Sequence, residues 1–133
     1  MKLGIYLATF LALFQRGGKD REARMSVTRL HVRQMLDTIE KSYTERITLD
    51  TFAQMLNRQS AYLGHVFRQE VGMTVHQWVT RVRLDHAAML IRQGVKIEAV
   101  SLIVGYKSKK NFYRQFRRYF ATTPHQYRAG SNM

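Results

Sequence analysis

The chain contains a weak internal repeat with an offset of 49 residues, and this repeat constrains the fold more than any other feature. Each copy holds a short apolar segment, a polar turn, a longer amphipathic segment and a Thr-x-x-Gln helix start. Self-similarity at a fixed offset is the signature of a structural unit that is used more than once. We therefore expect two related helical units. The matched residues are Leu63 and Phe112, Phe67 and Phe116, Arg68 and Arg117, Gly72 and Ala121, Thr74 and Thr123, and Gln77 and Gln126.

Apolar residues return at every third or fourth position over most of the chain, as in helices that bury one face. The predicted fold class is all-α, with brief ambiguity between helix and strand only at residues 3–14 and 99–104. The longest helix is expected over about residues 75–92, before Gly94. The positions predicted to face the core are Val32, Met35, Leu36, Ile39 and Tyr43; Leu49, Phe52, Ala53 and Leu56; Leu63, Val66 and Phe67; Val75, Trp78, Val79, Val82, Leu84, Leu90 and Ile91; Ile97, Val100 and Val104; and Phe112, Phe116 and Phe120.

Polar residues and glycine mark where these helices begin and end. Thr48 and Ser108 stand where helix N-caps belong, because their hydroxyls can accept a backbone N–H of the first turn. A Thr followed three residues later by Gln forms a capping box, at Thr74 and again at Thr123. Gly72 stands at a position typical of a helix C-terminus. These signals predict helix starts at corresponding places in the two copies.

The C-terminal copy combines an apolar stripe with a basic face. Phe112, Phe116 and Phe120 are spaced four apart, so they line one side of a helix. The net charge is +13, and no acidic residue follows Glu98. A chain this basic most often binds nucleic acid, with an anionic membrane surface or an acidic protein as the alternatives. The residues that fall mostly on the opposite side of this helix are Lys109, Lys110, Tyr113, Arg114 and Arg117.

The order of elements in each copy is that of a helix-turn-helix, whose second helix, the recognition helix, lies in the major groove of DNA. Asn57 and Gly105 stand in the two turns, and both residue types tolerate the left-handed backbone that such a turn needs. A helix over residues 75–92 would be about 27 Å long at about 1.5 Å per residue. Because successive major grooves on one face of B-DNA are about 34 Å apart, this helix would set two recognition helices into adjacent grooves.

Two long motifs and the helix between them resemble one known family. The residues that carry the resemblance are Leu49, Phe52, Ala53, Leu56, Tyr62, Leu63, Phe67, Arg68, Gly72 and Thr74; Trp78, Arg83, Leu84, Ala87, Leu90 and Ile91; and Ile97, Val100, Val104, Gly105, Tyr106, Ser108, Asn111, Phe112, Arg114, Phe116, Arg117, Phe120, Thr123, Pro124, Tyr127 and Arg128. This pattern resembles the DNA-binding module of the AraC/XylS transcriptional regulators. It covers about residues 30–129, which makes it far more specific than a short motif.

The resemblance implies a seven-helix module of two helix-turn-helix subdomains joined by a long linker helix. We expect the DNA-binding domain to span residues 25–133. Within it, residues 25–73 would form the first helix-turn-helix, 74–94 the linker helix and 95–133 the second helix-turn-helix. Residues 1–24 are then an apolar helix and linker, the remnant of a sensor or dimerisation domain.

The resemblance also implies a function and the residues that carry it. The expected function is that of a sequence-specific regulator of transcription, an activator that binds double-stranded promoter DNA, contacts RNA polymerase and works in the cytoplasm at the nucleoid. Arg and Lys can read guanine in the major groove, whereas other cations meet phosphates. The base-contact candidates are Lys109, Lys110, Tyr113 and Arg114 in the second recognition helix, and Ser60, Ala61, Gly64 and His65 in the first. The phosphate-contact candidates are Arg58, Arg68, Lys107, Ser108, Arg117 and Arg118.

The sequence departs from the family pattern at three positions. Ser101 replaces an alanine before the second turn, Ala121 replaces the glycine after the last recognition helix, and Gln59 replaces the N-cap serine of the first recognition helix. Gln59 is a poor cap, and Ser60 offers a start one residue later. The first recognition helix carries small or weak readers, so two roles stay open for it: weak base contact or docking on the DNA backbone only.

The sequence also bears on other classes of function. A basic helical module that coats nucleic acid or an anionic membrane without sequence choice is the alternative. The chain has no cysteine, which excludes disulfides, cysteine-based zinc sites and the acceptor residue of DNA-repair methyl-transfer proteins that contain a similar module. The histidines lack the paired spacing of a metal site, and no nucleophile–base set is evident. We expect no enzyme activity, no metal and no cofactor.

The segment Leu3–Phe14 is apolar except for Thr9, but it is too short to span a bilayer. No small-x-small cleavage site follows in residues 15–18, which disfavours secretion. It resembles the apolar dimerisation helix that often ends a sensor domain. We expect a homodimer through residues 3–14, with packing on another partner as the alternative, and no insertion into a membrane.

Overall fold

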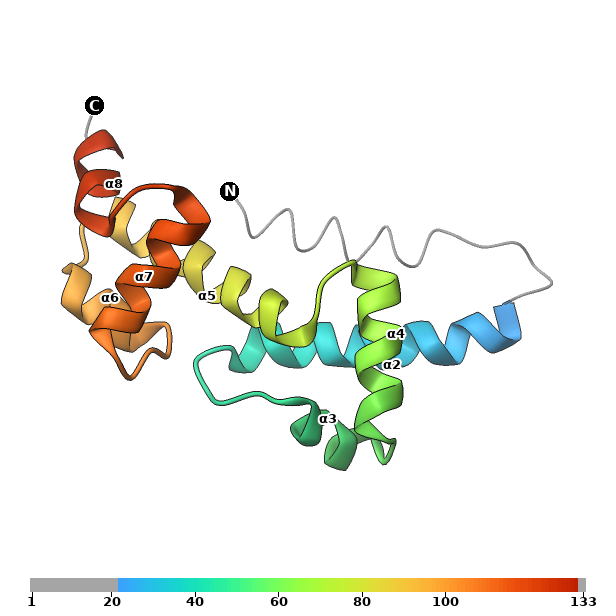
Figure 1. The fold of residues 1–133 in the computed structure, drawn as a ribbon. Coiled ribbons are helices and arrows are strands. Elements are labelled where there is room, and N and C mark those ends of the chain that lie inside the picture. The colour runs from blue at the N-terminus through green and yellow to red at the C-terminus, as the bar shows by residue number, and fades with distance from the viewer. Residues whose placement is uncertain (1–21, 132–133) are drawn as a thin grey trace. The chain divides into compact units, whose positions relative to one another are not determined.

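The computed structural model describes residues 22–131, and within this range the protein is helical, with no strand (Figure 1). The predicted all-α fold is confirmed, with seven helices within residues 22–131. Residues 3–14, the predicted dimerisation segment, lie outside the described residues. The helices are α2 (Glu22–Ser42), α3 (Leu49–Leu56), α4 (Ser60–Val71), α5 (Val75–Arg92), α6 (Ile97–Ile103), α7 (Lys109–Phe120) and α8 (Pro124–Ser131).

The chain divides into two compact units. The first unit contains residues 22–42 and 47–79 of the described range, and the second contains residues 43–46 and 80–131. Helix α5 is continuous through the division, so its first residues belong to the first unit and the remainder to the second. Each unit therefore holds one copy of the 49-residue repeat, with α3 and α4 in the first and α6 and α7 in the second.

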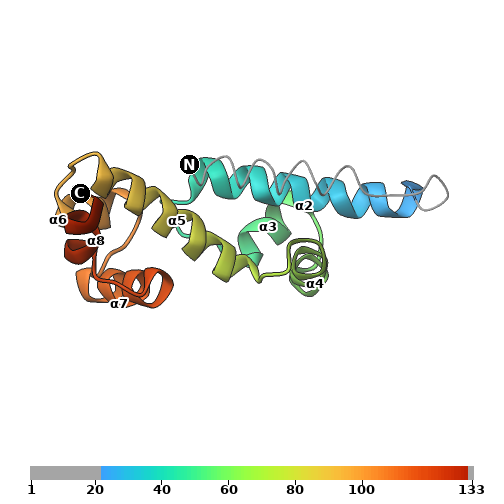
Figure 2. The same cartoon turned by 90° about the horizontal axis from the view of Figure 1, so that it is seen from above.

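The first unit is built around α4, which packs against both α2 and α3 (Figures 1 and 2). Burying large apolar side chains is the main favourable contribution to such packing. Most positions predicted for this core are buried, whereas Leu49, Ala53 and Leu56 are only half-buried. Its fully buried large side chains are Met35, Ile39, Phe52, Leu63 and Phe67.

The second unit forms its core from α6, α7 and the C-terminal part of α5. Phe112 and Phe116 have no exposed surface, so the phenylalanine stripe is core and not a platform for stacking bases, as predicted. Phe120 lies at the edge, with its ring centroid 5.4 Å from that of Tyr127 in α8. The buried cluster comprises Leu84, Ala87, Ala88, Ile91, Ile97, Val100, Val104, Tyr106, Phe112 and Phe116.

The predicted capping boxes occur in both units with the same geometry. The hydroxyl of Thr74 accepts the backbone N–H of Gln77 at 3.1 Å, and the Gln77 side chain accepts the backbone N–H of Thr74 at 3.0 Å. Thr123 and Gln126 make the same two bonds at 3.1 Å each. Each box satisfies backbone donors that a helix start would otherwise leave unpaired, which fixes where α5 and α8 begin.

The two turns and the two recognition-helix ends all use left-handed backbone. In the turns, Asn57 has φ 51° and Gly105 has φ 102°. After the recognition helices, Gly72 has φ 84° and Ala121 has φ 60°. A β-carbon makes this conformation costly by about 1–2 kcal/mol, so Ala121 is strained where Gly72 is not.

Residues 43–46, which we call the strap, belong to the second unit although they follow α2 in the chain. Tyr43 was predicted to continue the apolar face of the first helix; instead α2 ends at Ser42, and the Tyr43 ring stacks on His86, with centroids 4.2 Å apart. The Arg83 side chain donates to the backbone carbonyls of Tyr43 (2.6 Å) and Glu45 (2.7 Å). A β-carbon at Gly105 would lie 2.5 Å from the carbonyl oxygen of Thr44, so only glycine fits against the strap.

Candidate nucleic-acid interface

Helix α7 presents a basic outer face because its sequence alternates buried aromatic and exposed cationic positions at helical spacing. Ser108 caps it by accepting the backbone N–H of Asn111 at 3.2 Å, as predicted. Phe112 and Phe116 anchor the inner face in the core. Exposed positions among the predicted DNA contacts are Lys107, Ser108, Lys109, Lys110, Arg114, Arg117 and Arg118.

Lys109 is paired within the second unit. Its ammonium lies 3.3 Å from a carboxylate oxygen of Glu98 and 5.5 Å from the centroid of the Tyr113 ring. Hydrogen bonding to the Glu98 backbone and then to Lys109 holds the pKa of the Glu98 carboxyl below its usual value. Both side chains are more than half exposed, at 56% and 60%, so the pair is weak and Lys109 can exchange it for a DNA oxygen at small cost.

Tyr113 is half-buried and held from α8. Its hydroxyl lies 3.1 Å from Nε2 of His125, and the two rings meet edge to face with centroids 5.9 Å apart. This contact could not be predicted from the sequence, because His125 is not a motif residue and lies on another helix. The contact orients the Tyr113 hydroxyl toward the first turn of α8.

Arg114 is also held, by a neighbour on its own helix. Its Nη2 donates to the side-chain oxygen of Asn111 at 2.6 Å. Together with Arg117, Arg118 and Thr123, Tyr113 and Arg114 line an open hollow of about 610 Å³. Three arginines around one hollow are suited to polyanion oxygens, since each guanidinium presents several N–H donors.

Helix α4 offers a weaker surface than α7. Ala61 and His65 are exposed, but the hydroxyl of Ser60 donates to a carboxylate oxygen of Asp50 at 3.0 Å. The helix begins at Ser60 with Gln59 as N-cap, and Gln59 makes no side-chain capping bond. Ser60 is therefore the first residue of the helix and does not replace Gln59 as its N-cap.

Gly64 was predicted to face bases, and the structure places it against α3 instead. A β-carbon built there would lie 3.0 Å from Cδ1 of Leu49. Glycine at this position lets α3 and α4 approach closely. Its contribution is to helix packing, so the outer face of α4 is left with Ala61 and His65 and, in the last turn, the exposed Arg68.

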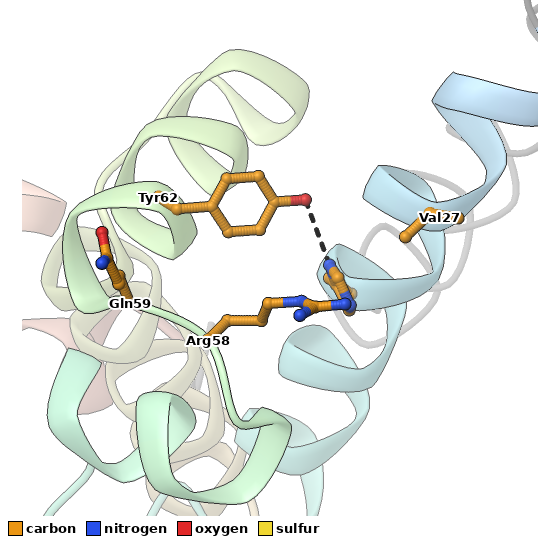
Figure 3. A pocket seen from close by; sticks show the side chains of 5 residues that line it. Val27, Arg58, Gln59 and Tyr62 are labelled. Carbon is orange, nitrogen blue, oxygen red and sulfur yellow. Dashed lines mark hydrogen bonds between the residues drawn. The ribbon is translucent and has the colours of Figure 1, made fainter.

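Arg58 reaches from the first turn into a pocket of about 370 Å³ that also involves Val27, His31, Gln59 and Tyr62 (Figure 3). The Tyr62 hydroxyl lies 3.1 Å from Nδ1 of His31, and their rings meet edge to face. Burial, and then the positive charge of Arg58, lower the pKa of His31. Sequence reasoning missed this cluster, because its members come from α2, the turn and α4.

Two negative findings apply to residues 22–131. No group of three or more His, Asp or Glu side chains is arranged to hold a metal ion. No helix in this range is both long and apolar enough to cross a membrane.

A family model described as a helix-turn-helix domain matches residues 52–130, more than half of the chain and most of both recognition units. The chain belongs to the AraC/XylS family of helix-turn-helix proteins. This family consists of DNA-binding transcriptional regulators and not of enzymes. The resemblance seen in the sequence is therefore confirmed.

Relatives within the AraC/XylS family show the same module. The chain is 30% identical over 112 residues to the melibiose operon regulatory protein of Escherichia coli, covering 81% of this chain and 37% of that protein. It is similar to the solved C-terminal domain of AraT, a response regulator from Geobacillus stearothermophilus, with 28% identity and a TM-score of 0.73 over 75% of this chain and 84% of that one.

A DNA-binding transcriptional dual regulator from Escherichia coli K-12 is similar as well, with 27% identity and a TM-score of 0.68 over 77% of this chain and 92% of that one. The chain thus spans about two fifths of the length of the melibiose operon regulatory protein, whereas it covers 84% and 92% of the two solved chains.

Proposed function

We propose that this protein is a sequence-specific regulator of transcription, an activator that binds double-stranded promoter DNA through α4 and α7. The observation that carries the proposal is the construction of α7. Its inner face is fixed by fully buried phenylalanines, and its outer face carries exposed cations at the positions that the family turns toward DNA. A rigid helix with such a face fits the major groove in shape and charge.

The two recognition helices would occupy adjacent major grooves. Helix α5 has 18 residues, so it is about 27 Å long at about 1.5 Å per residue. We propose residues 25–73 and 95–133 as the two helix-turn-helix subdomains and residues 74–94 as the linker helix. One chain would then supply two recognition helices, for which many helix-turn-helix proteins need a dimer.

We assign base contacts mainly to the second unit. The proposed base contacts are Lys109, Lys110, Tyr113 and Arg114, with a weaker contribution from Ser60, Ala61 and His65. The proposed phosphate contacts are Arg58, Arg68, Lys107, Ser108, Arg117 and Arg118. Charge supports this division, because α7 carries cations where α4 carries alanine and histidine.

Further partners follow from the same proposal. An activator of this family would touch RNA polymerase and act in the cytoplasm at the nucleoid. Residues 3–14 would join two copies into a dimer.

The proposal is tested by selecting bound duplexes from a random pool with the full chain. We expect an enriched motif with most of its sequence information in the half contacted by α7. Affinity should fall steeply as salt is raised, because phosphate contacts release counterions. A pool that returns no enriched motif, with equal affinity for all duplexes at fixed salt, would favour the alternative of a non-specific nucleic-acid-binding module.

A further inference from the structure

We propose that Asn111 and Gln115 are positioning residues that fix the Arg114 side chain for base reading, and that the Tyr106 hydroxyl anchors them. The three residues form one continuous chain of hydrogen bonds from the core of the second unit to its surface. The inference rests on the proposed function, because it assumes that Arg114 reads DNA. It goes further by naming residues that would determine specificity without touching a base.

The chain of bonds begins in the core. Tyr106 is only 6% exposed and belongs to the buried cluster of the second unit. The guanidinium of Arg83 lies 5.7 Å from the centroid of its ring. Burial raises the pKa of Tyr106 to about 12, so the hydroxyl keeps its proton and remains a hydrogen-bond donor at neutral pH.

Three bonds connect this hydroxyl to the surface. Tyr106 donates to Oε1 of Gln115 at 2.5 Å, and Nε2 of Gln115 donates to Oδ1 of Asn111 at 3.4 Å. The same Asn111 oxygen accepts Nη2 of Arg114 at 2.6 Å. Asn111 and Gln115 are four residues apart, so they lie one turn apart on the same side of α7.

The direction of the chain is set by Arg114, because a guanidinium has only donors. Arg114 therefore requires the oxygen of Asn111 and not its NH₂ group. That oxygen in turn requires the NH₂ group of Gln115, which leaves the Gln115 oxygen to accept from Tyr106. If the side-chain amide of Asn111 were rotated by 180°, its NH₂ group would face the Arg114 donor. If that of Gln115 were rotated, its oxygen would face the Asn111 oxygen. Each side chain in this series therefore has one consistent orientation.

This arrangement can favour recognition by ordering Arg114 in advance. A free arginine loses rotamer freedom when it binds, and a side chain that is already ordered avoids much of that loss. One nitrogen of the guanidinium donates to Asn111, and because Arg114 is exposed its other donors are accessible to a ligand. Two donors from one planar group are what bidentate contact with guanine requires.

The test combines Gln115→Met with Arg114→Ala in a double-mutant cycle, using the duplex obtained by selection and a scrambled duplex at one salt concentration. Methionine has about the length and the helix propensity of glutamine, but it makes neither of the two hydrogen bonds of the Gln115 side-chain amide. We expect Gln115→Met to weaken binding to the selected duplex by about 3–10-fold, with little change for the scrambled duplex, and to have no added effect in the Arg114→Ala background. Gln69→Met, on the exposed surface of α4, is the matched control and should change neither affinity.

Tyr106→Phe is a second break in the same chain and removes only the hydroxyl. Circular dichroism of each variant checks that the total helix content is unchanged before affinities are compared. Like Gln115→Met, Tyr106→Phe should lower the affinity for the selected duplex. Equal losses on selected and scrambled duplexes, or losses that add to that of Arg114→Ala, would overturn the proposal.

A readout without DNA separates this inference from the proposed function. Side-chain ¹⁵N relaxation of arginine in the free protein should show Arg114 more ordered than the exposed Arg118, and Gln115→Met should remove the difference. If Arg114 is as mobile as Arg118 in the unchanged protein, the positioning role is overturned. If Arg114 is ordered but Arg114→Ala weakens all duplexes equally, the base-reading function fails, and the specificity role fails with it.

Discussion

The two recognition helices share a backbone plan and differ in what they present. Helices α4 and α7 both have 12 residues, and the residue after each is left-handed and donates to a carbonyl four positions back at 2.8 Å. Their outer faces are unlike: α4 presents Ala61 and His65, whereas α7 presents Lys110 and Arg114. The repeat therefore preserves the scaffold that aims a recognition helix, and it leaves the reading surface free to diverge.

The supports of the two surfaces differ as well. In α7, contacts with Asn111 and His125 hold Arg114 and Tyr113. In α4, Ser60 is tied to Asp50 and Gly64 packs on α3. The outer face of α7 carries several cations, two of its side chains being held by neighbours, whereas that of α4 carries Ala61, His65 and only Arg68 as a permanent cation. We therefore expect an asymmetric footprint on DNA, with most sequence information under the second unit.

The largest effect is expected in the turns, where the two units respond differently to a β-carbon. Gly105→Ala places a carbon 2.5 Å from the Thr44 carbonyl oxygen, in left-handed backbone, and should destabilise the second unit by about 3 kcal/mol. Asn57→Ala in the first turn should cost only about 1 kcal/mol, since Asn already carries a β-carbon there.

Urea denaturation followed by circular dichroism measures both losses, and Trp78 fluorescence reports on the first unit. Trp78 is the single tryptophan and is buried in that unit. Equal destabilisation by the two substitutions would show that contact with the strap does not distinguish the turns.

The next effect concerns DNA discrimination. Arg114→Ala should remove about 1–3 kcal/mol of discrimination at one base pair, because a bidentate guanidinium contact is lost. His65→Ala should change discrimination by less, and Arg117→Ala should weaken all duplexes alike. Binding titrations against a set of single-base variants of the selected duplex measure the three effects. If His65→Ala matched Arg114→Ala, the expected asymmetry would be absent.

A smaller effect is expected at the ends of the recognition helices. Ala121→Gly should stabilise the protein by about 1 kcal/mol, because glycine adopts φ near 60° without a steric penalty. The reverse change in the first unit, Gly72→Ala, should destabilise it by about the same amount. Thermal denaturation of the pair measures both. Shifts of the same sign would contradict the equivalence of the two helix ends.

The smallest effect is a pH dependence confined to the first unit. The fold lowers the pKa of His31, so the native state takes up the proton at a lower pH than the unfolded chain, which does so near pH 6.5. Stability from this source is present above about pH 6.5 and decreases as the pH falls below it. Urea denaturation at pH 7.5 and 5.5, followed by Trp78, should show a larger loss in the unchanged protein than in His31→Gln.

The sequence predicted those parts of the structure that depend on local geometry. Thr74 and Thr123 form their capping boxes because both partners lie within one helical turn, and the phenylalanines of α7 are buried because spacing alone places them on one side. Gly105 and Asn57 adopt the left-handed backbone expected of the turns.

Contacts between distant segments could not be predicted in this way. Arg83 reaches two carbonyls of the strap, 40 and 38 positions away in the chain, and His31 contacts Tyr62 from another helix. Spacing could have suggested that Gln115 and Asn111 are neighbours, but the hydroxyl that anchors them comes from Tyr106, before α7 begins. Gly64 was misplaced because a glycine without a side chain gives no sign of which face it belongs to.

The strap has a consequence for biosynthesis. Residues 43–46 leave the ribosome well before Gly105 and most of the unit that they complete. During translation they are made before α3, α4 and α5, and therefore before Arg83 and Gly105, which contact them. A gene fragment that begins at Thr80 would encode α6, α7 and α8 but leave the Arg83 guanidinium without its two carbonyl acceptors. The second unit is thus made from two separate segments of the chain, and a fragment that contains all of it must extend back to Tyr43.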